Sequence, residues 1–232
     1  MIAIVTSTLI PNGAYSYYSN AERMQQTVET IIRLSALPLS AIYLFDNSTN
    51  KVDFSEILKV NTEIKIFSCP QFTFENKGLN EALLILNCIH NLPDDIPIFK
   101  ISGRYFPNEN FSLPDDDLFE KYDFAGFGKD FDHVVPYFST RAYFAKNRSV
   151  LQSLLVLAIE EMLSYSNGIH GIKSLFIAIK KKFKKTIGTE YQLSLEQSFG
   201  RILKHQQNAM LLQAINIEGY IAGSDFKEFI KE

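Results

Sequence analysis

The chain has 232 residues, of which 46% are hydrophobic and 21% are charged, a composition that suits one folded domain with a sizeable core. Its formal net charge of −3 gives no electrostatic basis for binding nucleic acid, which usually requires a basic domain. The sequence has no apolar run as long as a bilayer span and no basic start typical of a secretory signal. We therefore expect a cytoplasmic protein. Cys69 and Cys88 stand in unrelated contexts, so we expect free buried thiols, with a disulfide as the alternative.

The first hundred residues alternate between apolar runs and amphipathic segments. The apolar runs predict four strands, at 2–5, 41–45, 63–68 and 98–101. A capping-box spacing from Ser19 to Glu22 starts a helix that ends near Pro38, and two more helices are predicted at 54–60 and 79–90. Strands joined in this way form right-handed parallel crossovers. We therefore predict an α/β fold with a mostly parallel central sheet flanked by helices.

The second half of the chain is less regular. Its patterns predict strands at 122–127, 137–145 and 215–222, and helices at 149–162, 172–185 and 194–205. Residues 107–121 are acidic and rich in turn formers, and the last residues form a charged tail. Segment 149–162 is apolar nearly all round, which predicts a buried helix. Because no internal repeat or low-complexity linker is present, we expect a single domain over residues 1–232 with a helical C-terminal part.

The stretch Ile98–Phe106 is an apolar strand that ends abruptly in Ser102, Gly103 and Arg104. In open α/β sheets, ligands bind in the crevice beyond the carboxyl ends of the strands. A guanidinium in that position is suited to a bidentate grip on phosphate or carboxylate. The alternative is a buried strand followed by a turn whose arginine pairs with a nearby aspartate.

Three further motifs stand at corresponding places in the predicted fold. Thr6-Ser7 ends the first strand, Asp46-Asn47-Ser48-Thr49 ends the second, and Asn76 to Ala82 has the spacing N-x-G-x-x-x-A. In this order the motifs resemble the donor-binding half of GT-A type glycosyltransferases, particularly the inverting family-2-like enzymes. The resemblance covers most of residues 1–145 and, more loosely, residues 190–222.

The resemblance implies a single GT-A-like (Rossmann-like) domain in which residues 1–106 bind the nucleotide and residues 107–232 form the acceptor side. It implies transfer of a sugar from a nucleotide-sugar donor to a glycan or lipid-linked acceptor, in cell-surface polysaccharide synthesis. Asp46 also suits a cap or turn, and Lys77 also suits a plain surface charge. The residues expected to bind the donor are Thr6, Ser7, Asp46, Asn47, Asn76, Lys77, Asn80, Lys100, Ser102, Gly103, Arg104 and Arg141.

The chain departs from the family pattern at its centre. The resembled enzymes usually have a D-x-D motif where this chain has Ser102-Gly103-Arg104, and those carboxylates hold a divalent ion that bridges the donor diphosphate. Either Lys100, Arg104 and Arg141 meet the diphosphate charge without metal, or donor binding has been lost. The triplet Asp115 to Asp117 follows a proline, as an acidic helix start does, so we expect no metal site and no resident cofactor there.

An inverting transferase needs a general base that takes the proton of the acceptor hydroxyl. In the resembled family this base is a carboxylate near a helix start in the later half, and Glu196, in the first turn after Ser194, fits best. The alternative is an acid that merely complements the helix dipole. Asp123 and Asp130 are weaker candidates for the base.

Two further features and two rival functions remain open. Tyr15, Tyr17 and Tyr18 suit stacking on a base or sugar, or a tyrosine-rich surface loop. The run Lys180 to Lys185 suits contact with an anionic membrane surface or a solvated helix face. The first rival function is a non-catalytic nucleotide- or carbohydrate-binding module. The second is a nucleotidyltransferase, although residues 6–12 poorly match its glycine-rich phosphate loop.

Overall fold

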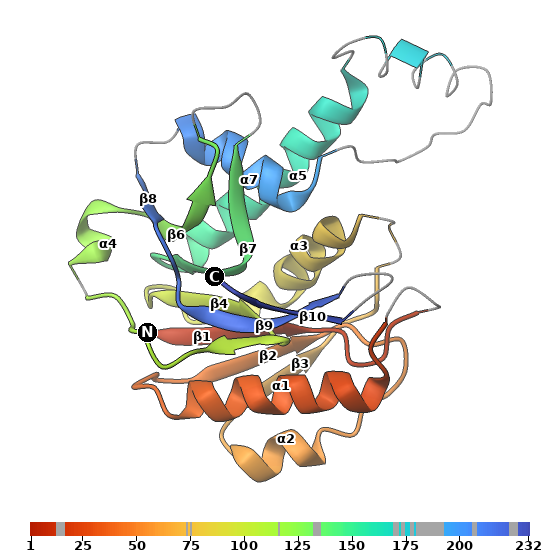
Figure 1. Cartoon of the computed structure of the whole chain (residues 1–232), viewed down its shortest axis with the longest axis vertical. Coiled ribbons are helices and arrows are strands. Elements are labelled where there is room, and N and C mark those ends of the chain that lie inside the picture. The colour runs from red at the N-terminus through yellow and green to blue at the C-terminus, as the bar shows by residue number, and fades with distance from the viewer. Residues whose placement is uncertain are drawn as a thin grey trace.

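A seven-stranded sheet crosses the molecule in the order β3-β2-β1-β4-β7-β6-β8, as Figure 1 shows. The computed structural model describes residues 1–12, 17–72, 74, 76–115, 117–131, 136–168, 172, 175–176, 179, 193–205, 208–222 and 227–232. The strands of the large sheet are β1 (Ile2–Ser7), β2 (Ile42–Asp46), β3 (Lys65–Ser68), β4 (Ile98–Ser102), β6 (Phe124–Lys129), β7 (Tyr137–Ala145) and β8 (Ala209–Leu212). A small sheet, in the order β10-β9-β5, contains β5 (Tyr105–Pro107), β9 (Ile217–Ala222) and β10 (Lys227–Lys231).

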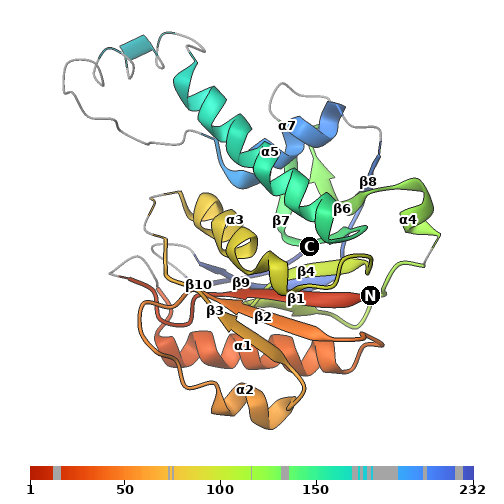
Figure 2. The ribbon, with the colours of Figure 1, turned by 180° about the vertical axis from the view of Figure 1, so that it is seen from behind.

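Helices cover both faces of the large sheet. Figures 1 and 2 show α1 (Asn20–Ser35) and α2 (Ser55–Val60) on one face, and α3 (Lys77–Cys88), α5 (Arg148–Asn167) and α7 (Leu195–His205) on the other. Strand β1 separates two apolar cores, because Ile2 and Ile4 belong to the core under α3, α5 and α7, whereas Ala3 and Val5 belong to the core over α1. The unbroken apolar run of β1 is therefore explained by burial on both faces.

The first four strands of the sheet are parallel, as predicted. β1 pairs with β2 on one side and β4 on the other, and β2 pairs with β3. The predicted capping box starts α1, since the amide of Glu22 donates to Ser19 Oγ at 3.3 Å and the amide of Ser19 donates to Glu22 Oε2 at 2.9 Å. The chain thus forms a single α/β domain with a mostly parallel central sheet.

The second half departs from the sequence-based prediction in several short elements. Strands β5, β8 and β10 were not predicted, and the turn η1 (Ile89–Asn91) ends the α3 segment. The short helix α4 (Leu118–Lys121) follows Asp117, the last residue of the predicted acidic helix start. β7 and β6 run antiparallel to their neighbours, whereas β8 is parallel to β6. The charged tail forms β10, which pairs antiparallel with β9. The unpredicted strands lie outside the regular alternation of strands and helices, so tertiary pairing decides them.

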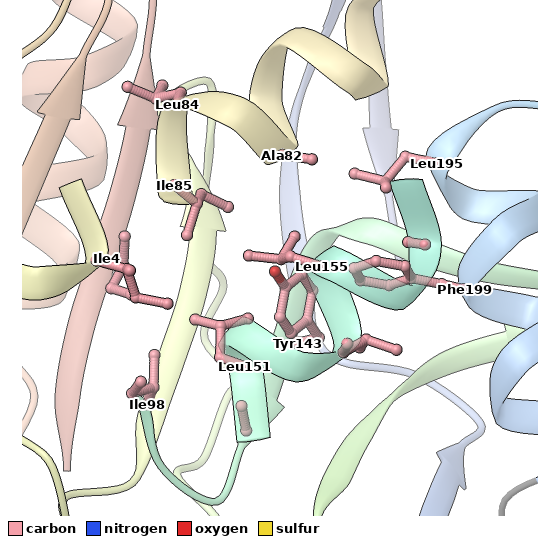
Figure 3. Packing of buried hydrophobic residues seen from close by; sticks show 14 of the residues in the cluster. Ile4, Ala82, Leu84, Ile85, Ile98, Tyr143, Leu151, Leu155, Leu195 and Phe199 are labelled. Atoms are coloured by element: carbon pink, nitrogen blue, oxygen red, sulfur yellow. The ribbon is translucent and has the colours of Figure 1, made fainter. Parts of the chain in front are cut away.

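An apolar layer fixes α7 against the sheet. In Figure 3, Ile85 of α3, Leu151 and Leu155 of α5 and Phe199 of α7 gather around Tyr143 of β7. The rings of Tyr143 and Phe199 meet edge to face, with centroids 5.7 Å apart. Because α7 is anchored on β7 in this way, its first turn is held at one end of the sheet.

Helix α5 is not the fully buried helix that its composition predicted. Val156, Leu157 and Leu163 are exposed, while Leu154 and Ala158 are buried. Only one face of α5 packs on α3, α7 and β7, so the apolar residues of the other face have nothing to cover them within the described residues. No described helix combines the length and the apolar character needed to cross a bilayer. The lysine run 180–185 lies outside the described residues.

The two cysteines are free and buried, as expected. Burial raises the pKa of the Cys69 thiol, and burial together with Cys69 raises the pKa of Cys88 to about 12. Both side chains are therefore protonated, unreactive parts of the core at neutral pH.

Candidate functional site

A cleft of about 900 Å³ opens at the carboxyl ends of the parallel strands. Thr6 and Ser7 at the end of β1 and Ser102 at the end of β4 line it. The chain proceeds from β1 to β2 and β3 on one side, and β4 lies on the other side of β1. Such a reversal of strand order is the place where open α/β sheets bind their ligands.

Ten of the thirteen predicted site residues line this cleft: Thr6, Ser7, Asn47, Lys77, Asn80, Ser102, Gly103, Arg104, Arg141 and Glu196. Asp46, Asn76 and Lys100 do not belong to the described lining. The sequence therefore brought the correct strand ends and helix starts together, while the roles of the individual residues remain predictions.

Asp46 is 1% exposed, and hydrogen bonds occupy both of its carboxylate oxygens. Oδ2 accepts from Ser7 Oγ at 2.6 Å and from the amide of Leu9 at 3.1 Å, and Oδ1 accepts from the amide of Ser48 at 2.9 Å. Asp46 thus shapes the two loops that follow β1 and β2. The predicted direct contact between Asp46 and a nucleoside does not fit this arrangement.

Asn76 is the N-cap of α3. Its Oδ1 accepts from the amide of Leu79 at 3.0 Å, and its Nδ2 donates to the carbonyl of Leu193 at 2.8 Å. The side chain ties the start of α3 to the segment that leads into α7. The predicted donor contact of Asn76 is therefore replaced by a structural role at the edge of the site.

Lys100 is also committed to the fold. Its side chain is 1% exposed, and its ammonium donates to Glu81 Oε1 at 2.6 Å, to Ser102 Oγ at 3.0 Å and to the carbonyl of Thr140 at 2.5 Å. An ammonium has three protons to donate, and all three are used. The prediction that Lys100 grips the diphosphate is therefore wrong for this geometry, because α3 and β7 enclose the side chain.

Glu81 is a cleft residue that sequence reasoning missed. Its Oε1 accepts from Lys100, from Thr6 Oγ1 at 2.7 Å and from Ser102 Oγ at 3.0 Å. Burial alone would raise the pKa of Glu81, but the Lys100 ammonium and these hydrogen bonds lower it below its ordinary value. The tips of β1 and β4 thus share one carboxylate, supplied by α3. The available signal was its spacing, one helical turn after Lys77.

The turn after β4 delivers Arg104 into the cleft. The amide of Gly103 donates to the carbonyl of Thr6 at 2.8 Å, and a Cβ on Gly103 would lie 3.1 Å from Thr27 Oγ1. Behind Arg104, its carbonyl accepts from the amide of Tyr220 at 3.0 Å. Strand β9 can approach so closely because a Cβ on Gly219 would lie only 2.2 Å from that carbonyl oxygen.

The Arg104 guanidinium is an incompletely satisfied buried cation. Its Nη1 is buried and finds no hydrogen-bond partner in the described part of the chain. Burial lowers the pKa of Arg104, and the nearby Tyr105 and Glu81 oppose that effect. Since buried polar groups are nearly always hydrogen-bonded, an atom of this kind requires an explanation.

Two further cations face Arg104 across the cleft. Burial and the charge of Arg104 lower the pKa of Arg23 to about 10, while Asp46 opposes this shift. Burial, Arg104 and Arg23 lower the pKa of Lys77. All three groups are cationic at neutral pH, and their mutual repulsion is relieved by an anion. Arg23 was missed in the sequence, although a basic residue in the first turn of α1 opposes the helix dipole and could have signalled it.

Arg141 also lines the cleft, but its charge is already met. Its Nη1 is hydrogen-bonded to Glu232 Oε2, and the carboxylate of Glu232 is 4% exposed. Burial opposes ionisation of Arg141, but the Glu232 carboxylate raises its pKa. The predicted role of Arg141 as a phosphate ligand would therefore compete with an existing ion pair.

Glu196 stands in the first turn of α7, at the cleft. The predicted capping box is present, since the amide of Gln197 donates to Ser194 Oγ at 3.2 Å and the amide of Ser194 donates to Gln197 Oε1 at 3.1 Å. Glu196 Oε1 accepts from Thr140 Oγ1 at 3.0 Å.

The other candidates for the general base, Asp123 and Asp130, lie outside the described lining of the cleft. Asp123 lies 3.8 Å from the Lys146 ammonium. Of the three tyrosines, Tyr17 and Tyr18 are absent from the described cleft lining, and Tyr15 lies outside the described residues. His133 and His170 also lie outside them. Among the residues that the structure does describe, no three His, Cys, Asp or Glu side chains cluster as metal ligands do.

Comparisons with known proteins bear on the fold. No protein-family model and no curated protein matches the sequence. Among solved structures, an active-site mutant of the galactosyltransferase LgtC aligns with a TM-score of 0.51 at 5% identity, covering 96% of this chain and 88% of LgtC. A 4-diphosphocytidyl-2C-methyl-D-erythritol synthase from Anaerococcus prevotii aligns with a TM-score of 0.49 at 11% identity, covering 91% of this chain and 87% of the synthase. The glycosyltransferase GlyE from Streptococcus pneumoniae aligns with a TM-score of 0.48 at 13% identity, and the aligned part is 91% of this chain but only 45% of GlyE.

The match to LgtC confirms the predicted fold. The chain has the α/β architecture of GT-A type nucleotide-sugar glycosyltransferases. Identities of 5% to 13% say nothing about individual residues, so the chemistry of the cleft has to be argued from its own side chains.

Proposed function

We propose that this protein is a glycosyltransferase that transfers a sugar from a nucleotide-sugar to a hydroxyl acceptor. The observation that carries the proposal is the cation cluster of Arg23, Lys77 and Arg104 in a cleft at the switch point of the sheet. The buried Nη1 of Arg104, which has no partner among the residues that the structure describes, is suited to a phosphate oxygen. Burial and the charge of Arg104 lower the pKa of both Arg23 and Lys77, and a diphosphate bound among the three cations would relieve their repulsion.

In this proposal the diphosphate lies against Arg104 and Arg23, with Lys77 at the exposed rim. This set differs from the one expected from sequence, because Lys100 is paired with Glu81 and Arg141 is paired with Glu232. A divalent ion fits the same place poorly, since Glu81 is the only described carboxylate between the tips of β1 and β4, and its Oε1 already accepts three hydrogen bonds. We therefore propose that cationic side chains meet the charge of the leaving diphosphate.

Glu196 is proposed as the general base. It would accept the proton of the acceptor hydroxyl while that oxygen bonds to the anomeric carbon and the bond from this carbon to the diphosphate breaks. The Thr140 hydroxyl, which donates to Glu196 Oε1, leaves Oε2 for the incoming proton and fixes the carboxylate in place. Displacement of this kind inverts the anomeric configuration.

For the acceptor we propose a glycan or lipid-linked glycan of cell-surface polysaccharide synthesis, used at the cytoplasmic side of a membrane. The support is the motif resemblance, together with the 76% exposed Ile172 and the 68% exposed Phe176 that precede the lysine run 180–185. Exposed apolar side chains followed by clustered lysines suit an anionic lipid surface.

The test is calorimetric titration with UDP, GDP, ADP and dTDP and with their glucose or mannose conjugates, each with and without manganese. We expect one base to bind in the micromolar range without metal, and its sugar conjugate to be hydrolysed slowly in the absence of acceptor. Binding that appears only with manganese would contradict the cationic clamp. Binding without any hydrolysis over long incubation would favour the non-catalytic module, and release of pyrophosphate from a nucleoside triphosphate and a sugar phosphate would favour a nucleotidyltransferase.

A further inference from the structure

Glu81 has a feature that the proposed diphosphate site does not use. Its Oε1 accepts three hydrogen bonds, whereas none of the bonds found in the described chain reaches Oε2. The side chain is 22% exposed and lines the cleft. One oxygen of this carboxylate is thus locked into the fold and the other is open.

The surrounding residues keep the Glu81 carboxylate ionised and fix its position. Lys100 of β4 contacts it at 2.6 Å and is itself 1% exposed, so the pair ties α3 to the sheet. Thr6 and Ser102, at the ends of two neighbouring strands, hold the same oxygen from two further directions. An ionised carboxylate can only accept hydrogen bonds, so the open oxygen is suited to a hydroxyl group.

The neighbours of Glu81 decide which hydroxyl group can reach it. Ser102, which donates to Glu81, is two residues from Arg104. The carboxylate of Glu81 also interacts electrostatically with the guanidinium of Arg104. A phosphate is attracted to Arg104 and repelled by Glu81. A ligand that satisfies both must carry hydroxyl groups directly beside its phosphates, as the sugar ring of a nucleotide-sugar does.

We propose that Glu81 accepts a hydrogen bond from a hydroxyl group of the transferred sugar and so selects which sugar the protein uses. This inference rests on the proposed function. Lys100 acts as a positioning residue, because it neutralises the inner oxygen of Glu81 and leaves the outer one to the sugar. A carboxylate supplied by α3 thus stands beside the position where the family motif would have put metal ligands, and it serves sugar recognition instead.

The test compares UDP-glucose with its 2-, 3-, 4- and 6-deoxy analogues, or the same series on the base that the nucleotide titration selects. For the unmodified protein we expect loss of one particular hydroxyl to weaken binding by roughly 10- to 100-fold, the usual effect of losing a hydrogen bond to a charged group. UDP itself reports the contacts of the nucleoside and the diphosphate without those of the sugar. Equal affinity for all the deoxy analogues would overturn the inference.

A paired variant, Glu81→Gln with Lys100→Met, removes the two charges together and leaves no unpaired ion behind. We expect this variant to bind UDP within about twofold of the unmodified protein but to lose the discrimination among deoxy analogues, which is the signature of a direct contact. The control, Glu161→Gln with Arg201→Met, removes a more exposed ion pair that lies outside the described cleft lining, and it should keep the discrimination. If the paired variant fails to fold, the analogue series on the unmodified protein still decides.

The possible failures are distinguishable. If no nucleoside diphosphate binds, the proposed function is overturned. If UDP binds but the paired variant keeps the discrimination, the role of Glu81 alone is overturned. If manganese strengthens binding to the unmodified protein and not to the paired variant, Glu81 is a metal ligand, and the sugar contact is overturned.

Discussion

The tip of β4 and the strand β7 each place an arginine at the same cleft. The two arginines differ in their hydrogen-bond partners. Arg141 on β7 has the buried carboxylate of Glu232 as its partner. Arg104 at the tip of β4 leaves Nη1 buried without a partner in the described residues. The carbonyl of Arg104 is well held by β9, so the backbone is fixed while the guanidinium is not satisfied.

This contrast separates charges that hold the fold from charges that await a ligand. In the Arg141–Glu232 pair each charge has its counter-charge, although Glu232 Oε1 accepts no hydrogen bond from the described residues. Removing one member of such a pair leaves the other uncompensated. A buried cation without a partner costs free energy in the free protein, and a ligand that supplies the anion recovers it. A cationic nitrogen that lines the cleft and has no partner among the described residues therefore indicates function better than the mere presence of a charge there does.

The largest expected effect is on stability, at β7. Arg141→Met leaves the Glu232 carboxylate buried and unpaired, so we expect the free energy of unfolding to fall by about 3 kcal/mol. Urea denaturation measures it. The double variant Arg141→Met with Glu232→Gln should recover most of the loss. If it does not, the ion pair is not what stabilises β7.

The next effect is on binding, at the β4 tip. Arg104→Met removes the proposed phosphate ligand, so we expect affinity for the nucleoside diphosphate to fall roughly 10- to 100-fold. Because the substitution also removes a buried unsatisfied donor, the free energy of unfolding should stay level or rise by about 1 kcal/mol. Titration and urea denaturation of the same sample measure both. A variant that is destabilised and binds normally would reverse the assigned roles of Arg104 and Arg141.

A series of melting temperatures at acid pH tests the ion pair between Glu81 and Lys100. The pKa of Glu81 is lower in the folded protein than its ordinary value of 4.5, so its stabilising contribution is full above about pH 4.5 and is lost as pH falls through the lower folded value. We expect the melting temperature of the unmodified protein to fall more steeply below pH 4.5 than that of the variant Glu81→Gln with Lys100→Met. Parallel curves for the two proteins would show that the pair contributes nothing.

The smallest effect is expected at the rim. Lys77 is exposed, so a contact with phosphate is screened, and Lys77→Met should weaken nucleotide binding only about two- to fivefold. The loss should shrink further as salt is raised from 50 to about 300 mM. Lys59→Met, on the exposed surface of α2, is the matched control and should leave binding unchanged. Equal effects of the two substitutions would mean that net charge, and not position, matters.

Much of the fold followed from the sequence because the first half of the chain is periodic. Apolar runs located β1 to β4, capping residues located the starts of α1 and α7, and the order of the motifs predicted the cleft at the strand ends. Strands β5, β8 and β10 escaped because they lie outside the regular alternation of strands and helices in the first half, and their pairing with other strands decides them. The exposed face of α5 escaped because composition alone does not say how many sides a helix packs on.

The partition of charges within the site could not be read from sequence. Strand alternation placed Lys100 and Arg104 near one strand end, but only the packing of α3 decides that Glu81 reaches Lys100. In the same way, Arg141 could be judged only once β10 had brought Glu232 to it. Arg23 and Glu81 line the cleft because of their positions on α1 and α3. These positions can be read from the sequence, but they indicate a site only once the packing of the helices is known.

The central claim is that Arg104 receives the diphosphate of a nucleotide. A crystal structure of the protein soaked with uridine diphosphate tests it most directly. We predict a phosphate oxygen within hydrogen-bonding distance of Arg104 Nη1, with the Arg141–Glu232 pair unbroken. A diphosphate bound to Arg141 after displacing Glu232, with Arg104 Nη1 still unpartnered, would contradict the account.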